Sequence, residues 1–413
     1  MSLWCLKKVL FFTVFLVTLV LTFPAFASET YFSSYLKLKG GYDSNIAFTY
    51  YNPEEDFIAV VSPFFYLNYK TSRTACYSKV GLDFYEYAKH TKLNTVNQYY
   101  EVKGDYLLKE NLKVYGKASF IKDTTLQSEL QETGIVHVRE GRKRYNLTLG
   151  SEYFIDELNQ LSLEISGART EYAWKYYVDY NTINVSTKLQ HQMKTQRDFL
   201  IFNLYYTNTN SEASKVNQSG FIIGWKHLLS ETTNFVISSG ACYSIMNYYV
   251  YYQSIIFNSS VWPPFQVIIV KKRQTDKEWN YLFNFFIQKQ EEKLNYFLGG
   301  NHNLIYSSFG ETVKRTLFFG KISYKWTPRL SSLFSLNYYI TYSEGRIYKE
   351  DNRYVTFRSR VRYALRKNCF FEFLYSYSYF DNRVRNHIFD RNQVWLILTF
   401  QFGKPPATEY KTF

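Results

Sequence analysis

Residues 353–366 read RYVTFRSRVRYALR, and this stretch decides the fold. A β-strand places alternate side chains on opposite faces, so the segment has one apolar face and one basic face. The apolar face holds Val355, Phe357, Val361 and Tyr363, and the basic face holds Arg358, Arg360, Arg362 and Arg366. An arginine facing lipid at mid-bilayer would cost about 2–4 kcal/mol. The sequence therefore predicts a strand that separates lipid from water.

The same two-residue rhythm runs from Tyr31 to Phe402, and it predicts an all-β fold: a single antiparallel transmembrane β-barrel of about 18 strands, with 16 as the alternative count. The predicted strands are residues 31–41, 56–70, 74–88, 97–109, 111–122, 141–155, 159–171, 179–193, 197–207, 217–229, 232–247, 275–289, 293–307, 313–326, 330–343, 353–366, 369–381 and 391–402. A large soluble sandwich or propeller is the alternative. The sequence lacks the recurrent Gly and Trp-Asp motifs of propeller blades.

The connections between these segments alternate in length. Eight are short and polar, near Thr71, Glu110, Glu157, Lys194, Glu231, Glu291, Pro328 and Lys367. The others are longer, such as residues 43–55, 122–140 and 343–352. Outer-membrane barrels place short turns in the periplasm and long loops outside, so we expect both termini to be periplasmic.

The N-terminus carries an export signal. Lys7 and Lys8 precede the apolar run 9–21, and Ala25-Phe26-Ala27 offers a cleavage site. The run is shorter than the ~20 residues of a spanning helix, so we expect cleavage. The predicted division is a signal peptide at 1–27, a barrel at 28–402 and a short periplasmic tail at 403–413. The expected location is the outer membrane of a Gram-negative bacterium.

Composition agrees with a membrane barrel. Aromatic residues make up 20% of the chain, with 41 Tyr and 36 Phe, while the mean hydropathy is −0.31. A barrel needs aromatic residues at both membrane interfaces and polar residues in its lumen. The formal net charge is +14 with no long basic run, so the positive charge is spread along the strands.

The period of two predicts which bases line the lumen. The predicted pore-lining bases are Arg358, Arg360, Arg362, Lys37, Lys39, Lys79, Lys103, Lys113, Lys117, Arg144, Lys188, Lys226, Lys321 and Lys325. Inward acids are fewer, for example Asp83, Glu101 and Glu372. A surplus of positive charge in a pore selects anions. The alternative is that these residues only form salt-bridge networks that stiffen the wall.

One long connection, residues 248–274, has an apolar character. It contains Trp262, Pro263, Pro264 and Phe265. We expect this segment either to fold into the lumen as a plug or to form an extra hairpin outside.

Catalytic motifs are missing from the sequence. The six histidines show no zinc-binding spacing, and there is no GxSxG elbow, phosphate loop or nucleic-acid motif. We therefore expect no enzyme activity, no cofactor, no metal and no nucleic-acid partner.

The opening of the predicted barrel resembles a known family. Gly41-Tyr42-Asp43-Ser44-Asn45-Ile46 is followed by a loop and by residues 56–67, DFIAVVSPFFYL. This opening is similar to the outer-membrane β-barrels found with bacterial exopolysaccharide and exosortase (PEP-CTERM) gene clusters. The resemblance implies a role in polysaccharide export or display. The predicted size and basic lumen also resemble, in architecture only, the eighteen-stranded alginate export porin.

Three functional hypotheses follow. The first is a monomeric channel that exports an anionic or neutral exopolysaccharide through a basic lumen, together with a separate periplasmic component. The second is a general or anion-preferring diffusion porin. The third is a closed structural barrel whose loops bind a partner.

Overall fold

The computed structural model describes residues 29–135, 138–174, 177–257 and 265–403. They form eighteen strands: β1 (Glu29–Asp43), β2 (Asp56–Lys70), β3 (Thr74–Tyr87), β4 (Thr95–Lys109), β5 (Leu112–Thr124), β6 (Gly141–Phe154), β7 (Asn159–Tyr172), β8 (Tyr180–Gln192), β9 (Asp198–Ser211), β10 (Ser214–Leu228), β11 (Thr233–Phe257), β12 (Phe265–Gln290), β13 (Leu294–Tyr306), β14 (Thr312–Lys325), β15 (Leu330–Tyr342), β16 (Asp351–Arg366), β17 (Cys369–Asn382) and β18 (His387–Gly403). Two short helices are η1 (Thr91–Leu93) and α2 (Glu129–Thr133). No helix of the described ranges is both long and apolar enough to cross a membrane.

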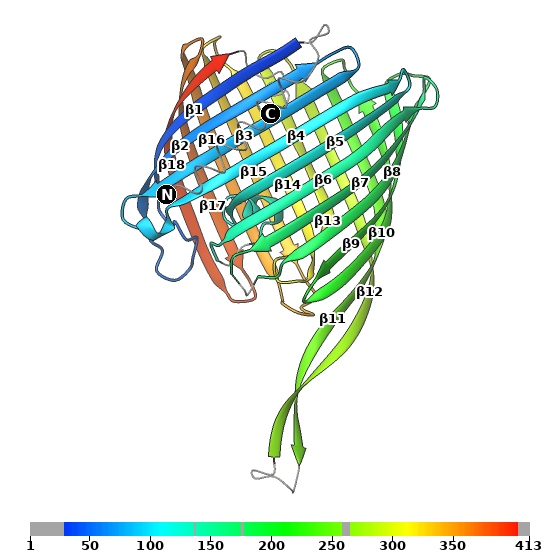
Figure 1. The fold of residues 1–413 in the computed structure, drawn as a ribbon, viewed down its shortest axis with the longest axis vertical. Helices are drawn as coiled ribbons and strands as arrows, with labels where there is room; N and C mark the ends of the chain where they lie inside the picture. The colour runs from blue at the N-terminus through cyan, green and yellow to red at the C-terminus, as the bar shows by residue number, and fades with distance from the viewer. Residues whose placement is uncertain (1–28, 136–137, 175–176, 258–264, 404–413) are drawn as a thin grey trace.

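The strands follow chain order around one closed antiparallel barrel (Figure 1). β1 pairs with β2 on one side and with β18 on the other, where Leu36 lies opposite Phe400. Closure pairs every strand with a neighbour on both sides, which satisfies backbone hydrogen bonds where water is absent. The pairing of β12 with β13 covers only part of the two strands and ends at Phe283 and His302. Each of the eighteen predicted strands coincides with an observed one. The predicted signal peptide and residues 404–413 of the predicted tail lie outside the described residues.

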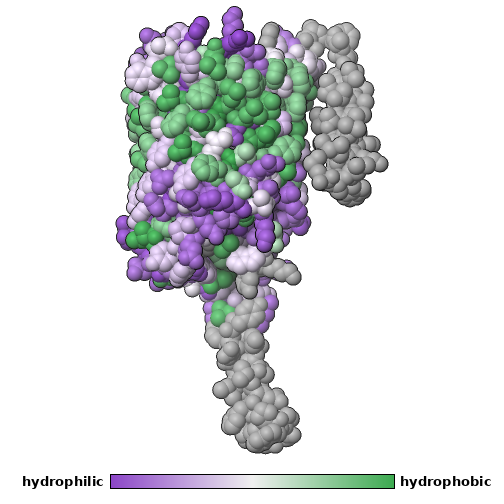
Figure 2. Space-filling view, turned by 90° about the vertical axis from the view of Figure 1, so that its left-hand side faces the viewer, coloured by the Kyte–Doolittle hydropathy of each residue, from purple (hydrophilic) through white to green (hydrophobic). Residues whose placement is uncertain are grey.

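The outer face of the barrel is apolar. On β16, Val361, Tyr363 and Leu365 are exposed, as are Leu147 and Leu149 on β6. On the face that Figure 2 shows, hydrophobic side chains form a band across the barrel, and hydrophilic side chains gather toward the end of the long loops. An exposed apolar belt of this extent needs lipid as its solvent, so the chain is an outer-membrane β-barrel.

Short turns lie at one end of the barrel and long loops at the other. Residues 29 and 403, where the described chain begins and ends, lie at the end with the short turns, because Glu29 pairs with Lys70 and Ser33 with Gly403. The turns are held by their own side chains. Asp156 Oδ1 accepts the backbone N–H groups of Leu158 and Asn159, each at 2.8 Å. These bonds and the side-chain hydrogen bond from Asn159 lower the pKa of Asp156.

Residues 248–274, for which the sequence left a lumen plug or an outer hairpin open, contain paired strands over their described part. β11 and β12 continue as a two-stranded ribbon through 248–257 and 265–274, and this ribbon projects away from the barrel beyond the long-loop end (Figure 1). The described arms therefore follow the predicted outer hairpin. Trp262, Pro263 and Pro264 lie outside the described residues, as does the side chain of Phe265.

Candidate pore and its constriction

The inner wall carries all fourteen bases that the sequence assigned to the pore. Each lies on the strand face opposite the exposed apolar residues or in register with an inner-face neighbour: Lys37, Lys39, Lys79, Lys103, Lys113, Lys117, Arg144, Lys188, Lys226, Lys321, Lys325, Arg358, Arg360 and Arg362. Because successive side chains of a strand point to opposite faces, the strands that place apolar side chains in lipid point these cations toward the lumen.

Carboxylates on the inner wall are shared between bases. Glu101 lies 3.0 Å from Lys103 Nζ and 3.1 Å from Lys117 Nζ. Glu372 lies 3.6 Å from Arg360 and 3.4 Å from Arg362. One negative charge offsets only one of two positive charges, so these clusters keep a net positive charge.

Aromatic rings hold other bases in place. Lys79 Nζ lies 5.4 Å from the centre of the Phe64 ring and 5.8 Å from that of Tyr66. The Arg362 guanidinium lies 3.9 Å from the Phe370 ring centre. Such contacts attract a cation to the ring face without neutralising its charge.

The short-turn end of the lumen contains a basic cavity of about 440 Å³. Lys321, Lys325, Arg329, Arg360 and Arg362 all line it. The cavity is open to solvent and large enough for a small organic anion, so it forms a positively charged vestibule.

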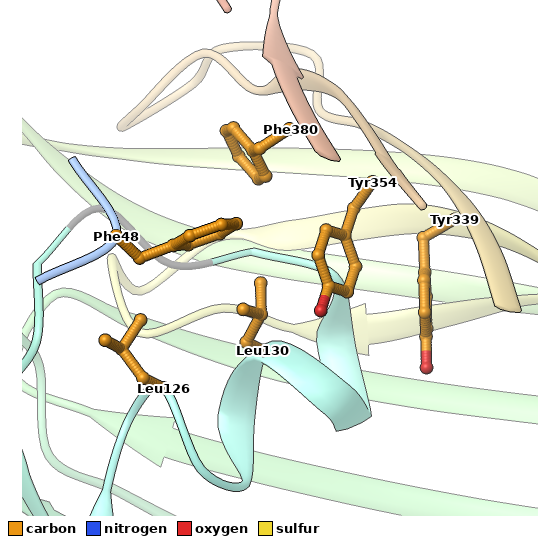
Figure 3. Packing of buried hydrophobic residues seen from close by; sticks show 6 residues of the cluster. All are labelled: Phe48, Leu126, Leu130, Tyr339, Tyr354 and Phe380. Carbon is orange, nitrogen blue, oxygen red and sulfur yellow. The ribbon is translucent and has the colours of Figure 1, made fainter. Parts of the chain in front are cut away.

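The connection between β5 and β6 folds into the barrel. Leu126, Leu130 and Ile135 in this segment are 6%, 2% and 1% exposed. Together with Phe48, Leu126 and Leu130 pack against inner-wall rings from β15, β16 and β17; Figure 3 shows this cluster, Phe48, Leu126, Leu130, Tyr339, Tyr354 and Phe380. The result is a hydrophobic core inside the lumen at the long-loop end, where α2 narrows the passage.

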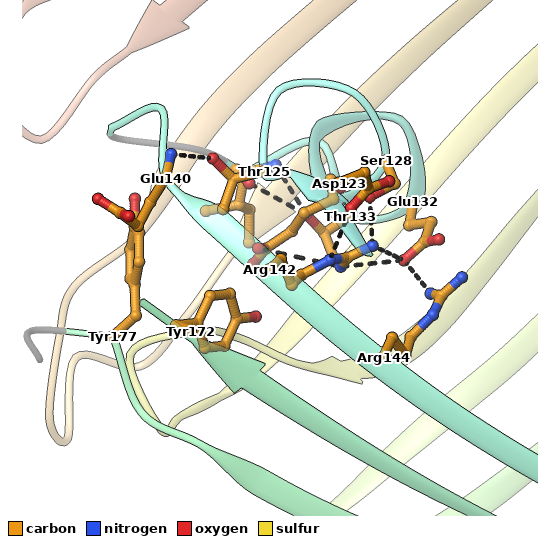
Figure 4. A network of polar contacts seen from close by, with 12 residues as sticks. Asp123, Thr125, Ser128, Glu132, Thr133, Glu140, Arg142, Arg144, Tyr172 and Tyr177 are labelled. Atoms are coloured by element: carbon orange, nitrogen blue, oxygen red, sulfur yellow. Dashed lines mark hydrogen bonds and ion pairs between the residues drawn. The ribbon is translucent and has the colours of Figure 1, made fainter. Parts of the chain in front are cut away.

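Arg142 on β6 anchors the β5–β6 connection to the part of the wall that β5 and β6 form (Figure 4). Its side chain is 2% exposed and lies 3.8 Å from Asp123, 4.0 Å from Glu129 and 3.3 Å from Glu132. Arg144 binds the same Glu132 carboxylate at 2.5 Å. A buried guanidinium surrounded by carboxylates is costly to separate from them, so this cluster is a strong anchor.

The opposite wall holds the far side of α2. Tyr339 Oη donates a hydrogen bond to the Gln131 carbonyl at 2.5 Å, and Gln131 Nε2 donates to Tyr354 Oη at 3.2 Å. Arg315 on β14 donates to the Glu132 carbonyl. The segment therefore bridges the lumen from β6 to β14, β15 and β16.

Glu129 is a buried titratable group of this bridge. It is 2% exposed, and burial raises the pKa of its carboxyl to about 7, with Arg142 acting in the opposite direction. The charge of the bridge therefore changes near neutral pH.

A second cavity, of about 690 Å³, lies beside α2. Its wall is rich in uncharged hydrogen-bonding groups, including Asn146, Thr182, Asn184, Thr207 and Asn301. Thr207 Oγ1 donates to Asn184 Oδ1 at 2.9 Å, so part of this wall is already ordered. Glu132, Arg144 and Arg315 also line this cavity, so its wall is mainly uncharged and polar whereas the vestibule is basic.

The sequence reasoning missed the constriction. It treated 122–140 as an ordinary long loop, and it considered only 248–274 as a possible plug, with an outer hairpin as the alternative for that segment. The signal available was Leu126, Leu130 and Ile135 placed among charged and polar residues in a connection that should face water.

Comparison with known families gives a partial match. The sequence model of the family described as "Putative beta-barrel porin 2" matches residues 31–204, which is less than half of the chain. The match supports an outer-membrane β-barrel of porin-like type. No curated protein matches this chain.

Solved structures match this chain at low sequence identity. OccK9 (OpdG) of Pseudomonas aeruginosa has a TM-score of 0.47 and 9% identity, over 91% of this chain and 99% of that one. The channel DcaP of Acinetobacter baumannii has a TM-score of 0.43 and 10% identity, over 91% and 98%. The copper transporter OprC has a TM-score of 0.46 and 10% identity; the match covers 89% of this chain and 66% of OprC.

Proposed function

We propose that this barrel is an outer-membrane channel that conducts anionic solutes along the basic sector of its lumen. The observation that carries the proposal is the sharing of single carboxylates between two bases, at Glu101 and at Glu372. Shared neutralisation leaves positive charge along the path. Weak binding sites in series let an anion enter and leave, which conduction requires.

The proposed orientation places the short turns in the periplasm and the long loops outside. Both ends of the barrel sequence, Glu29 and Gly403, are then periplasmic. The vestibule of Lys321, Lys325, Arg360 and Arg362 faces the periplasm, and the α2 bridge lies toward the cell surface. An exported anion would meet positive charge first and the constriction second.

Export of an exopolysaccharide is the finer form of this proposal. It is supported by the resemblance of residues 41–67 to barrels of exopolysaccharide clusters, and by a lumen that combines basic and neutral hydrogen-bonding walls. An acidic glycan would use both kinds of wall. The proposal includes a monomeric barrel that receives its substrate from a separate periplasmic component.

An anion-preferring diffusion porin is the second candidate, and the α2 bridge favours it. A segment packed across the lumen by Leu126 and Leu130 limits the width available to a polymer, while the cavity of about 690 Å³ beside α2 has room for small anions. The third hypothesis is a closed barrel that binds a partner, and it requires that the α2 bridge stays packed across the lumen at all times.

Uptake into liposomes separates these functions. Purified barrel would be reconstituted, and the entry of a polyuronate oligosaccharide, of a neutral dextran of the same length and of a small dicarboxylate would be followed. The export proposal expects the oligouronate to cross faster than the dextran. Entry of the dicarboxylate alone would support the diffusion porin, and entry of none would support the closed barrel.

A further inference from the structure

The lipid-facing side of β12 changes from apolar to basic along the strand. Its outward side chains run Ile287, Phe285, Phe283, Tyr281 and Trp279 from the short-turn end toward the long-loop end. Trp279 and Tyr281 are 69% and 66% exposed. This band covers about nine residues, the length with which a tilted strand crosses the bilayer core. Its aromatic end therefore marks the membrane interface.

Basic residues begin directly past that aromatic end. Lys277, Arg273 and Lys271 lie on the same outward face as Trp279, and all three are exposed. The six-residue span from Lys277 to Lys271 corresponds to about 20 Å of strand. Lys277 therefore lies directly past the apolar band, and Arg273 and Lys271 follow it along the strand into the ribbon.

Neighbouring strands extend this row. Lys215 on β10 is exposed and is in register with Asn247 of β11, which pairs with Thr275 between Arg273 and Lys277. Lys271 Nζ lies 4.0 Å from the ring centre of Tyr249, and Tyr243 lies 5.0 Å from Trp279, ring to ring. The patch is thus a basic row with an aromatic border.

The acids of the same stretch do not neutralise the row. Asp276 and Glu278 lie on the other face of β12, where Arg346 binds both of them and Lys314 binds Glu278. Both carboxylates are therefore engaged by bases that do not belong to the row.

The far edge of β12 is open beside the patch. Its register with β13 ends at Phe283 and His302, while the pairing with β11 continues to the end of the ribbon. A ligand at the row can therefore approach both the basic side chains and the strand edge.

We infer that the outward row of Lys271, Arg273 and Lys277, with Lys215, binds the phosphorylated head groups of outer-leaflet glycolipid. Acyl chains lie along the apolar band below Trp279, and phosphates lie at the row above it, so one amphiphile satisfies both surfaces. A free anion would meet only the row. The assignment to the outer leaflet rests on the proposed orientation, whereas binding in detergent does not depend on it.

The test uses the full-length mature barrel in a neutral maltoside detergent, with bound lipid counted by native mass spectrometry. The probes are lipid A, phosphatidylcholine and inorganic phosphate. The test variant is Lys271→Gln with Arg273→Gln and Lys277→Gln. The matched control changes three exposed bases at the short-turn end, Arg73→Gln, Lys109→Gln and Lys367→Gln. Heat-modifiable gel migration confirms that both variants are folded.

Each base at a lipid surface strengthens binding by about fivefold, so the test variant is expected to bind lipid A about a hundredfold more weakly than the native barrel. The control variant should bind as the native barrel does, and phosphatidylcholine should bind far more weakly to all three. Equal binding of lipid A by the folded test variant would overturn the inference. Full displacement of lipid A by inorganic phosphate would also overturn it, because the site would then recognise a free anion.

Discussion

Replacing Gly134 with alanine should loosen the bridge across the lumen. Gly134 ends α2 with a φ of +73°, a left-handed conformation that glycine adopts without penalty. It also lies against the opposite wall, since a Cβ built on it would be 2.7 Å from Tyr339 Cβ. Alanine therefore adds backbone strain and a collision at the point where the bridge meets β15.

The size of the effect follows from these two terms. A left-handed alanine costs about 1–2 kcal/mol, and overpacking of a filled contact costs about 1–3 kcal/mol. The sum of about 2–5 kcal/mol would raise the equilibrium constant for opening by about 30-fold to about 4,000-fold. Leu126, Leu130 and Ile135 each contribute about 1.5–3 kcal/mol in the opposite direction, so the bridge should open transiently rather than stay open.

Single-channel recording would measure this directly as the time spent in a high-conductance state. The matched control is Gly345→Ala, because Gly345 has a φ of +77° in a loop of the rim and its nearest side-chain contact is the flexible Lys349. Gly134→Ala should increase high-conductance dwell time, and Gly345→Ala should not. Identical records for the two variants and the native channel would refute the reasoning that the bridge limits the current.

Three further outcomes are expected. Arg358→Ala with Arg360→Ala should reduce anion selectivity, measured as a smaller reversal potential, while heat-modifiable migration stays normal. Arg391→Leu should lower stability by about 3–5 kcal/mol, seen as a lower unfolding temperature on gels, because it leaves the buried Asp43 carboxylate, 2.5 Å away in the native barrel, without its cation. The folded pKa of Glu129 lies above its unfolded value, so docking of the bridge should be strongest below about pH 4.5 and weaken as the pH rises to about 7. Channel opening should therefore increase over that range, and Glu129→Gln should remove the dependence; an unchanged pH profile in that variant would contradict it.

The strands could be predicted because their signal is local. In β16, Val361 and Arg360 are adjacent in sequence, and an apolar side chain belongs in lipid whereas a charged one belongs in water. The alternation of such residues is therefore enough to identify the strand and to say which face points to the lumen. The same rule placed Lys321 and Arg360 on the inner wall. It needed no knowledge of which strands pair.

The constriction could not be predicted in the same way because its contacts are remote. Gln131 meets Tyr339 and Tyr354, which lie 208 and 223 residues further along the chain. A helix of five residues also has too few turns to show an amphipathic period. The choice between a plug and an outer hairpin for residues 248–274 stayed open for a different reason. The arms of the ribbon, such as residues 250–257, are apolar at most positions and show no alternation between polar and apolar side chains.

The central claim is that the lumen keeps a positive charge along a conducting path. The measurement that tests it most directly is the reversal potential of the purified barrel in a planar bilayer under a potassium chloride gradient. A basic lumen predicts a reversal potential displaced toward the equilibrium potential of chloride. A steady current with a reversal potential at zero, or displaced toward that of potassium, would contradict the account.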